Sequence, residues 1–239
     1  MRWKWRTHLI CWEMGLPLTK IGVLWCFVSA ANALLSCCSF YSPYWIRGEI
    51  FNHTEVYLGL IRRCNYPVML ENQRLDIIMD CGRYANFWAI PSPWWRLAVA
   101  LAGTSCALAL LVFFIIVLCC AVENSVSRIS ARLVGASQVF GGVIQLAALV
   151  CFAMGLNNLE AREACGESAA AFQTGPKCDL FWAFYVASLS SLLALTGLAM
   201  AWRACDIEYS YLYRISTKNL LRSTPLCRMS LGAWAAESL

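Results

Sequence analysis

Histidine and cysteine are the residues of this sequence best suited to chemistry, because they supply nucleophiles, proton carriers and metal ligands. The chain has two histidines, His8 and His53, and fourteen cysteines. It contains no His-Glu-x-x-His, Cys-x-x-Cys or Gly-x-Ser-x-Gly pattern and no phosphate-binding glycine loop. The sequence therefore predicts a protein that is not an enzyme and that has no catalytic, cofactor-binding or metal-binding residue.

Disulfide formation is the chemistry that remains for the cysteines, and it requires an oxidising compartment. Composition indicates that a membrane separates two compartments along this chain. Hydrophobic residues make up 60% of the sequence and charged residues only 14%, whereas a soluble domain has about 25% charged residues. Lipid is the natural environment for that much apolar surface. The cysteines must therefore be sorted by side of the membrane before any are paired.

Four stretches without charge are long enough to cross a bilayer, which takes roughly 20 apolar residues. They predict membrane helices over about 21–44, 97–122, 133–157 and 180–202, because only helices satisfy every backbone group in lipid here. Residues 21–203 then form a tetraspan domain between terminal segments 1–20 and 204–239. We expect spans two to four to form the bundle, and exposed faces of span one or four to dock against a partner.

The distribution of charge predicts that both termini are cytoplasmic, in a multi-pass plasma-membrane protein. With that orientation, eleven of the 19 basic residues lie inside with five acidic residues, for a charge of +6. The outside loops, about 45–96 and 158–179, carry the other eight with nine acidic residues, for −1. Aromatic residues near the outer ends of the spans predict a belt at the membrane interface. These are Tyr41, Tyr44, Trp45, Trp94, Trp95, Phe181, Trp182 and Tyr185.

With this topology, four cysteines lie on the oxidising side, two in each loop: Cys64, Cys81, Cys165 and Cys178. Pairing within each loop is the simplest arrangement, and pairing across the loops remains open. The longer loop alternates β-branched or aromatic runs with polar breaks, which predicts a small antiparallel extracellular sheet. The shorter loop predicts turns. Asn52 starts an Asn-x-Thr glycosylation sequon, and the alternative is that it lies too near the membrane for use.

The third span carries its polar residues on one face: Gln138, Gly141, Gly142 and Gln145. One interpretation is a polar permeation path. The preferred one is helix packing, in which the glycines admit a neighbouring helix and the amides bond across the interface. At the C-terminus, Glu237-Ser238-Leu239 matches a PDZ-ligand pattern, which chance often produces.

Several short motifs resemble the lipoma HMGIC fusion partner-like tetraspan family, within the wider claudin-like group. They include Pro43-Tyr44-Trp45, Gly59-Leu60 ahead of Cys64, and the cysteine pair of the shorter loop. Two departures, Ser42 in place of glutamine and Ile61 in place of tryptophan, identify a divergent member. The resemblance implies a four-helix bundle under a small extracellular sheet, to which the second loop adds a strand.

The resemblance also implies a function, that of an accessory subunit supporting the trafficking, assembly or gating of a membrane channel or receptor. The alternative is a claudin-like junction or barrier protein that self-associates. Membrane lipids, a channel or receptor subunit, a second copy and a PDZ protein are the expected partners. Nucleic acid is not among them.

Overall fold

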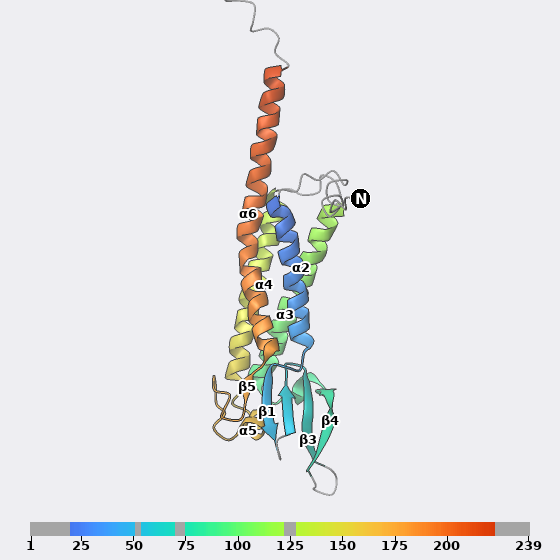
Figure 1. Ribbon diagram of the computed structural model, residues 1–239, viewed down its shortest axis with the longest axis vertical. Helices are drawn as coiled ribbons and strands as arrows, with labels where there is room; N and C mark the ends of the chain where they lie inside the picture. Colours follow the sequence, from blue (N-terminus) through green and yellow to red (C-terminus); the bar gives the residue numbers. More distant parts are fainter. Residues whose placement is uncertain (1–19, 51–53, 70–74, 122–127, 223–239) are drawn as a thin grey trace, which may run out of the picture.

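The structure is a computed structural model that describes residues 20–50, 54–69, 75–121 and 128–222. Four long helices stand side by side, with a sheet at one end of the bundle (Figure 1). The helices are α2 (Lys20–Tyr41), α3 (Pro93–Ala121), α4 (Arg128–Met154) and α6 (Trp182–Arg222). Each contains a segment long and apolar enough to span a membrane. The predicted α-helical membrane protein with four spans is thereby confirmed.

The helix ends differ from the charge-free stretches. Helix α3 begins at Pro93 and so includes Arg96, whose side chain turns back to the preceding loop. Helix α2 ends at Tyr41, where Pro43 and the first strand follow. Helix α6 continues without a break to Arg222, well past the apolar segment that ends at Arg203. Charge-free length therefore located the spans but not the ends of the helices.

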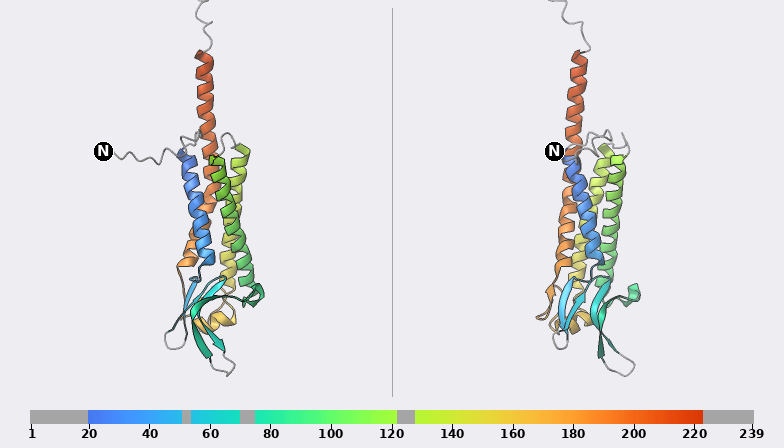
Figure 2. Two further views of the ribbon diagram at one scale, coloured as in Figure 1. Left: turned by 90° about the vertical axis from the view of Figure 1, so that its right-hand side faces the viewer. Right: turned by 45° about the vertical axis from the view of Figure 1, so that its right-hand side comes forward.

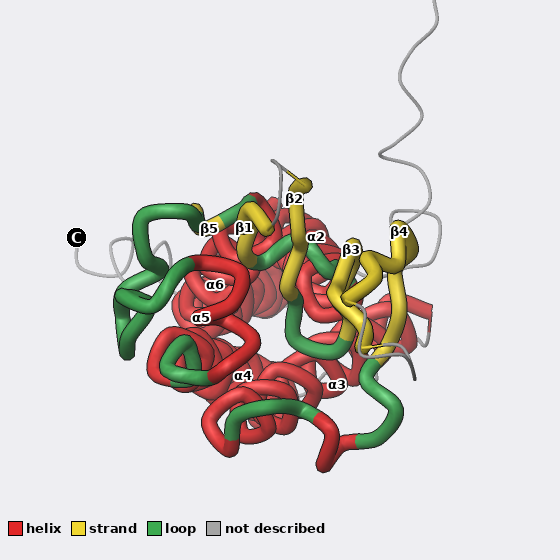
Figure 3. The backbone as a smooth tube through the Cα atoms, turned by 90° about the horizontal axis from the view of Figure 1, so that it is seen from below, coloured by secondary structure: helices red, strands yellow, loops and turns green. Residues whose placement is uncertain are grey.

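The sheet has five antiparallel strands in the order β4-β3-β2-β1-β5. Four come from the longer loop, namely β1 (Ile46–Ile50), β2 (Thr54–Leu58), β3 (Arg62–Met69) and β4 (Leu75–Arg83). The fifth, β5 (Asp179–Leu180), comes from the shorter loop, as the family resemblance implied. Seen from the sheet end, the strands curve over one side of the ring of helices (Figure 3).

Two short helices complete the sheet end of the molecule. One is α5 (Leu159–Cys165), and the other is the 3-10 helix η2 (Phe87–Ala89) just before α3. The shorter loop was predicted to contain only turns, so α5 is an addition. Its signals are ordinary capping residues: Asn158 accepts a hydrogen bond from the Ala161 N–H at 2.8 Å, and Gly166 follows the last turn with a φ of 97°.

Small residues hold the four helices together, as expected where lipid removes the hydrophobic force between helices. A Cβ atom added to Gly142 of α4 would lie 3.0 Å from the Ala194 Cβ of α6, and one on Gly135 would lie 2.7 Å from the Ala201 Cβ. Helix α2 contacts both α3 and α6. The expectation that spans two to four alone form the bundle was therefore wrong, because the first span is part of it (Figure 2).

Candidate interaction site at the sheet end of the bundle

Two of the motifs that carry the family resemblance touch each other where the sheet meets the helices. A Cβ atom added to Gly59 would lie 2.6 Å from the Ser42 carbonyl oxygen and 2.7 Å from the Pro43 Cα. Only glycine allows so close an approach between two backbones. Leu60, the next residue, is 1% exposed. The Gly-Leu and Pro-Tyr-Trp motifs therefore form a single joint between β2 and the end of α2.

Trp45 is the centre of that joint. Its side chain is fully buried, its indole N–H donates to the Ser39 carbonyl oxygen at 2.8 Å, and its ring lies 4.8 Å from the Phe152 ring. Trp95 stacks on Phe152 with ring centroids 5.4 Å apart, and its indole N–H donates to the Phe152 carbonyl oxygen. Both tryptophans were predicted to lie in the interfacial belt. That prediction was wrong for them, because they form the core that joins the sheet to the helices.

Tyr44 is partly exposed and packs against three other aromatic rings. Its ring lies 5.0 Å from Tyr57 of β2, 6.1 Å from Phe181 and 5.8 Å from Trp182. The Tyr57 hydroxyl donates to the Glu55 carboxylate, and this hydrogen bond is the main reason why the pKa of Tyr57 is raised. The aromatic cluster thus connects both loops to the start of α6.

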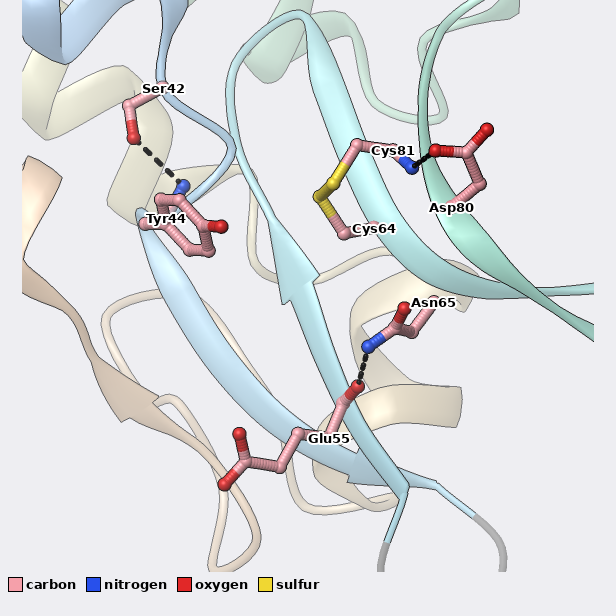
Figure 4. The surroundings of a disulfide bond; sticks show 7 residues. All are labelled: Ser42, Tyr44, Glu55, Cys64, Asn65, Asp80 and Cys81. Atoms are coloured by element: carbon pink, nitrogen blue, oxygen red, sulfur yellow. Dashed lines mark hydrogen bonds between the residues drawn. A yellow bond between two sulfur atoms is a disulfide. The ribbon is translucent and has the colours of Figure 1, made fainter.

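Each loop has a disulfide, Cys64–Cys81 in the longer loop and Cys165–Cys178 in the shorter one. Cys64 and Cys81 pair β3 with β4 (Figure 4). Cys178 lies against β1, where a Cβ atom on Gly48 would come within 2.6 Å of its sulfur. By the chain-entropy model a closed loop of this size is worth about 3 kcal/mol. The disulfides therefore hold a sheet too small to be stable alone.

A charged cluster links the two loops directly. Nη1 of Arg63 in β3 lies 2.5 Å from Oε1 of Glu160 in α5, and the Tyr84 hydroxyl donates to Oε2 of Glu160 at 2.9 Å. The guanidinium also lies over the rings of Tyr66 and Tyr84, at 4.1 and 5.2 Å. Burial and the neighbouring carboxylate raise the pKa of Tyr84, so that its hydroxyl stays protonated as a donor. We call Arg63, Tyr66, Tyr84 and Glu160 the inter-loop cluster.

A cavity of about 50 Å³ opens beside this cluster, between β1, β2 and α5. Sites for small organic molecules have about 300–1,000 Å³. This volume suits water. Within the described residues, no group of three or more His, Cys, Asp or Glu side chains could hold a metal ion.

The packing residues predicted in the third span, now α4, face different neighbours. The Gln138 side chain accepts from the Trp25 indole N–H at 2.7 Å and donates to the Ser29 hydroxyl at 2.6 Å, both on α2. Gly141 approaches α3, where its carbonyl oxygen accepts from the Ser105 hydroxyl, and Gly142 approaches α6. Gln145 is also buried, at 2% exposure, but its Oε1 has no hydrogen-bond partner among the described residues. The contacts of Gln138, Gly141 and Gly142 are those of a packed helix interface.

Several predicted residues fall outside what the structure describes. Asn52 and the terminal Glu237-Ser238-Leu239 lie outside the described ranges. The sequon and the PDZ pattern therefore stay predictions.

Comparison with known proteins decides the family. The family model described as lipoma HMGIC fusion partner-like protein matches residues 21–212. The chain belongs to this family. The match covers all four spans and both loops, and the four-helix bundle with its five-stranded sheet fits a claudin-like fold. Members of this family are non-enzymatic tetraspan membrane proteins.

Proposed function

We propose that this lipoma HMGIC fusion partner-like protein is a non-enzymatic accessory subunit of a membrane channel or receptor. In this proposal it lies in the plasma membrane with both termini cytoplasmic and the sheet outside. The observation that carries the proposal is that the buried Gln138 side chain inside the bundle is bonded to Trp25 and Ser29. A polar side chain committed to helix packing favours a scaffold over a permeation path.

The joint around Trp45 supports the same function. A buried tryptophan and the close Gly59–Pro43 contact fix the sheet to the helices. A partner that touches both its ectodomain face and its membrane face is then held in one geometry. Such a rigid adaptor can favour one assembly or gating state of the partner through differential contacts alone.

The alternative, a claudin-like protein that self-associates, is favoured by one observation, the position of β4 at the end of the sheet. Open edges pair readily with other strands. Cys64 and Cys81 lie opposite each other with Cα atoms 4.0 Å apart. This short spacing is that of an antiparallel pair without mutual hydrogen bonds, in which the backbone N–H groups point away from the partner strand. The Cys81 N–H therefore points to the open edge of β4.

That N–H is already occupied. Oδ1 of Asp80 accepts from it at 2.7 Å (Figure 4). The register between β3 and β4 also shifts beside Asn65, whose φ is 57°. A charged residue and a bulge are two devices that make an edge unattractive to another strand. The accessory function is therefore preferred to strand-to-strand polymerisation.

The test is a tagged pull-down from native membranes in mild detergent, followed by mass spectrometry and native sizing. The accessory function predicts a stoichiometric channel or receptor, and a ladder of this chain alone would favour the junctional alternative. Cys64→Ser is expected to unfold the sheet, reduce surface delivery and lose the partner. Cys38→Ser, which removes an exposed free thiol on α2, is the matched control and is expected to keep all three. Normal delivery and binding by Cys64→Ser would contradict the proposal.

A further inference from the structure

Besides the aromatic residues at the ends of the spanning helices, three large aromatic side chains of the loops are exposed at the sheet end of the bundle. Trp88 is 73% exposed and Phe87 44% exposed, both in η2, and Phe172 of the shorter loop is 63% exposed. The Phe87 and Trp88 ring centroids lie 5.7 Å apart, and contiguous exposed apolar surface marks contact sites. None of the three was among the residues that the sequence assigned to the interfacial belt. We call Phe87, Trp88 and Phe172 the aromatic rim.

Arg96 fixes the position of Phe87 and Trp88 along the axis of the bundle. Its Nε donates to the Ile90 carbonyl oxygen at 3.0 Å and its Nη2 donates to the Trp88 carbonyl oxygen at 2.9 Å. Since Arg96 belongs to the first turn of α3, these bonds hold η2 beside that turn and not above it. The membrane-spanning segment of α3 begins at Pro93. Helix η2 projects sideways from the end of the bundle at that level (Figure 2).

A backbone hydrogen bond fixes the position of Phe172 along the axis of the bundle. The Phe172 N–H donates to the Ala153 carbonyl oxygen at 3.0 Å, in the last turn of α4. Ala170 and Gln173 exchange two hydrogen bonds, of 3.1 and 2.9 Å, around a tight turn. Phe172 has a φ of 63° in that turn, a conformation that bulky side chains rarely adopt. Such strain, maintained at an exposed aromatic residue, points to a contact that uses the ring.

The charge beside the rim is positive. The Arg96 guanidinium lies 5.3 Å from the Trp88 ring centroid. No carboxylate of the described residues lies within ion-pair distance of it, and neither of its two hydrogen bonds uses Nη1. An aromatic ring with a cation at the boundary of a membrane span matches the headgroup layer, where tryptophan and arginine both gather and where phosphate is the acceptor.

We propose that the aromatic rim, together with Arg96, is a lipid-contact surface that seats the sheet end of the protein in the phospholipid headgroup layer. The rings lie in the interfacial layer and Nη1 of Arg96 faces a lipid phosphate. The rim is attached to α3 through Arg96 and to α4 through the Phe172 N–H. This proposal does not depend on the accessory function.

The experiment places a photoreactive benzoylphenylalanine at position 88, 172 or 55 in the full-length chain. Glu55 is the control because it is exposed near the start of β2, at the far end of the strand from the bundle. The proteins are reconstituted in phosphatidylcholine vesicles and irradiated. The expected result is a mass increase of one phospholipid at positions 88 and 172, and none at 55. Arg96→Gln should abolish the lipid adduct at 88 and leave that at 172.

Two results would overturn the proposal. Cross-links from positions 88 and 172 to a second copy of this chain would make the rim a protein interface. Absence of lipid adducts at both positions, with each protein eluting as folded material from a sizing column, would place the rim in water. A pull-down that finds no partner leaves these outcomes unchanged, so the failure of the two proposals can be told apart.

Discussion

Breaking the Arg63–Glu160 pair is expected to loosen the contact between the two loops by an amount that depends on which partner is removed. Glu160 is the more buried side chain, at 16% exposure against 29% for Arg63. Arg63→Met leaves a carboxylate there with only the Tyr84 hydroxyl as a donor. Glu160→Gln leaves an amide oxygen that still accepts from Tyr84, and an arginine that still stacks on two rings.

The magnitudes follow from partial burial. Exposed ion pairs contribute about 0–1 kcal/mol, and hydrogen bonds to charged groups contribute about 1.5–3 kcal/mol. We expect Arg63→Met to cost about 2 kcal/mol and Glu160→Gln about 1 kcal/mol. The double variant should cost about 1 kcal/mol less than their sum, because the two side chains act as one unit.

Native-state amide hydrogen exchange of the segment around α5 measures this opening free energy. A change of 1.4 kcal/mol is tenfold in the protection factor, so the expected effects are well resolved. Glu163→Gln is the matched control, since Glu163 lies on the same helix and is exposed. Equal losses for the two single variants, or losses that add fully in the double variant, would refute the assignment of a coupled, part-buried pair.

Three further outcomes are expected. The raised pKa of Tyr84 means that the folded protein resists ionisation of this phenol. The stability that this group contributes should be fully present below about pH 10 and be lost as the pH rises above it. In thermal unfolding scans, Tyr84→Phe should reduce that loss of stability at high pH. Gly59→Ala should lower thermal stability by about 1–3 kcal/mol through overpacking, whereas Gly103→Ala, whose added Cβ would lie 3.4 Å from the nearest atom, should be tolerated. Gln138→Leu should cost about 1–2 kcal/mol because it strands the Trp25 indole N–H, with Ser137→Ala, whose hydroxyl bonds only within α4, as the unaffected control in the same detergent assay.

Elements that depend on local composition could be predicted from the sequence. Four spans follow from charge-free length alone, and the sheet follows from alternating runs between polar breaks. Helix α5 was readable in principle from Asn158 and Gly166, but a seven-residue helix hardly differs in composition from a polar loop. The end of α2 was placed too late because aromatic residues continue the apolar run past Tyr41 into β1.

Elements that depend on contacts between distant residues could not be predicted in this way. Trp45 and Trp95 have the composition and position of interfacial residues, and only their common contact with Phe152 makes them core. Arg63 and Glu160 lie 97 residues apart, and nothing local selects one partner among the many charges of the two loops. Phe172 could not be recognised as strained, because its φ is imposed by the turn from Ala170 to Gln173.

Apart from the cysteine pair, the residues that carry the family resemblance have a structural role, which their positions explain. Pro43, Tyr44 and Trp45 leave α2 and enter the sheet, while Gly59 and Leu60 bring β2 back against that same point. Phe181 and Ala183 donate backbone hydrogen bonds to the carbonyl oxygens of Trp45 and Tyr44, so the start of α6 is held there as well. The motif therefore specifies a fixed angle between the sheet and the helices. A protein that acts by presenting two surfaces at a set angle would need that joint to be rigid.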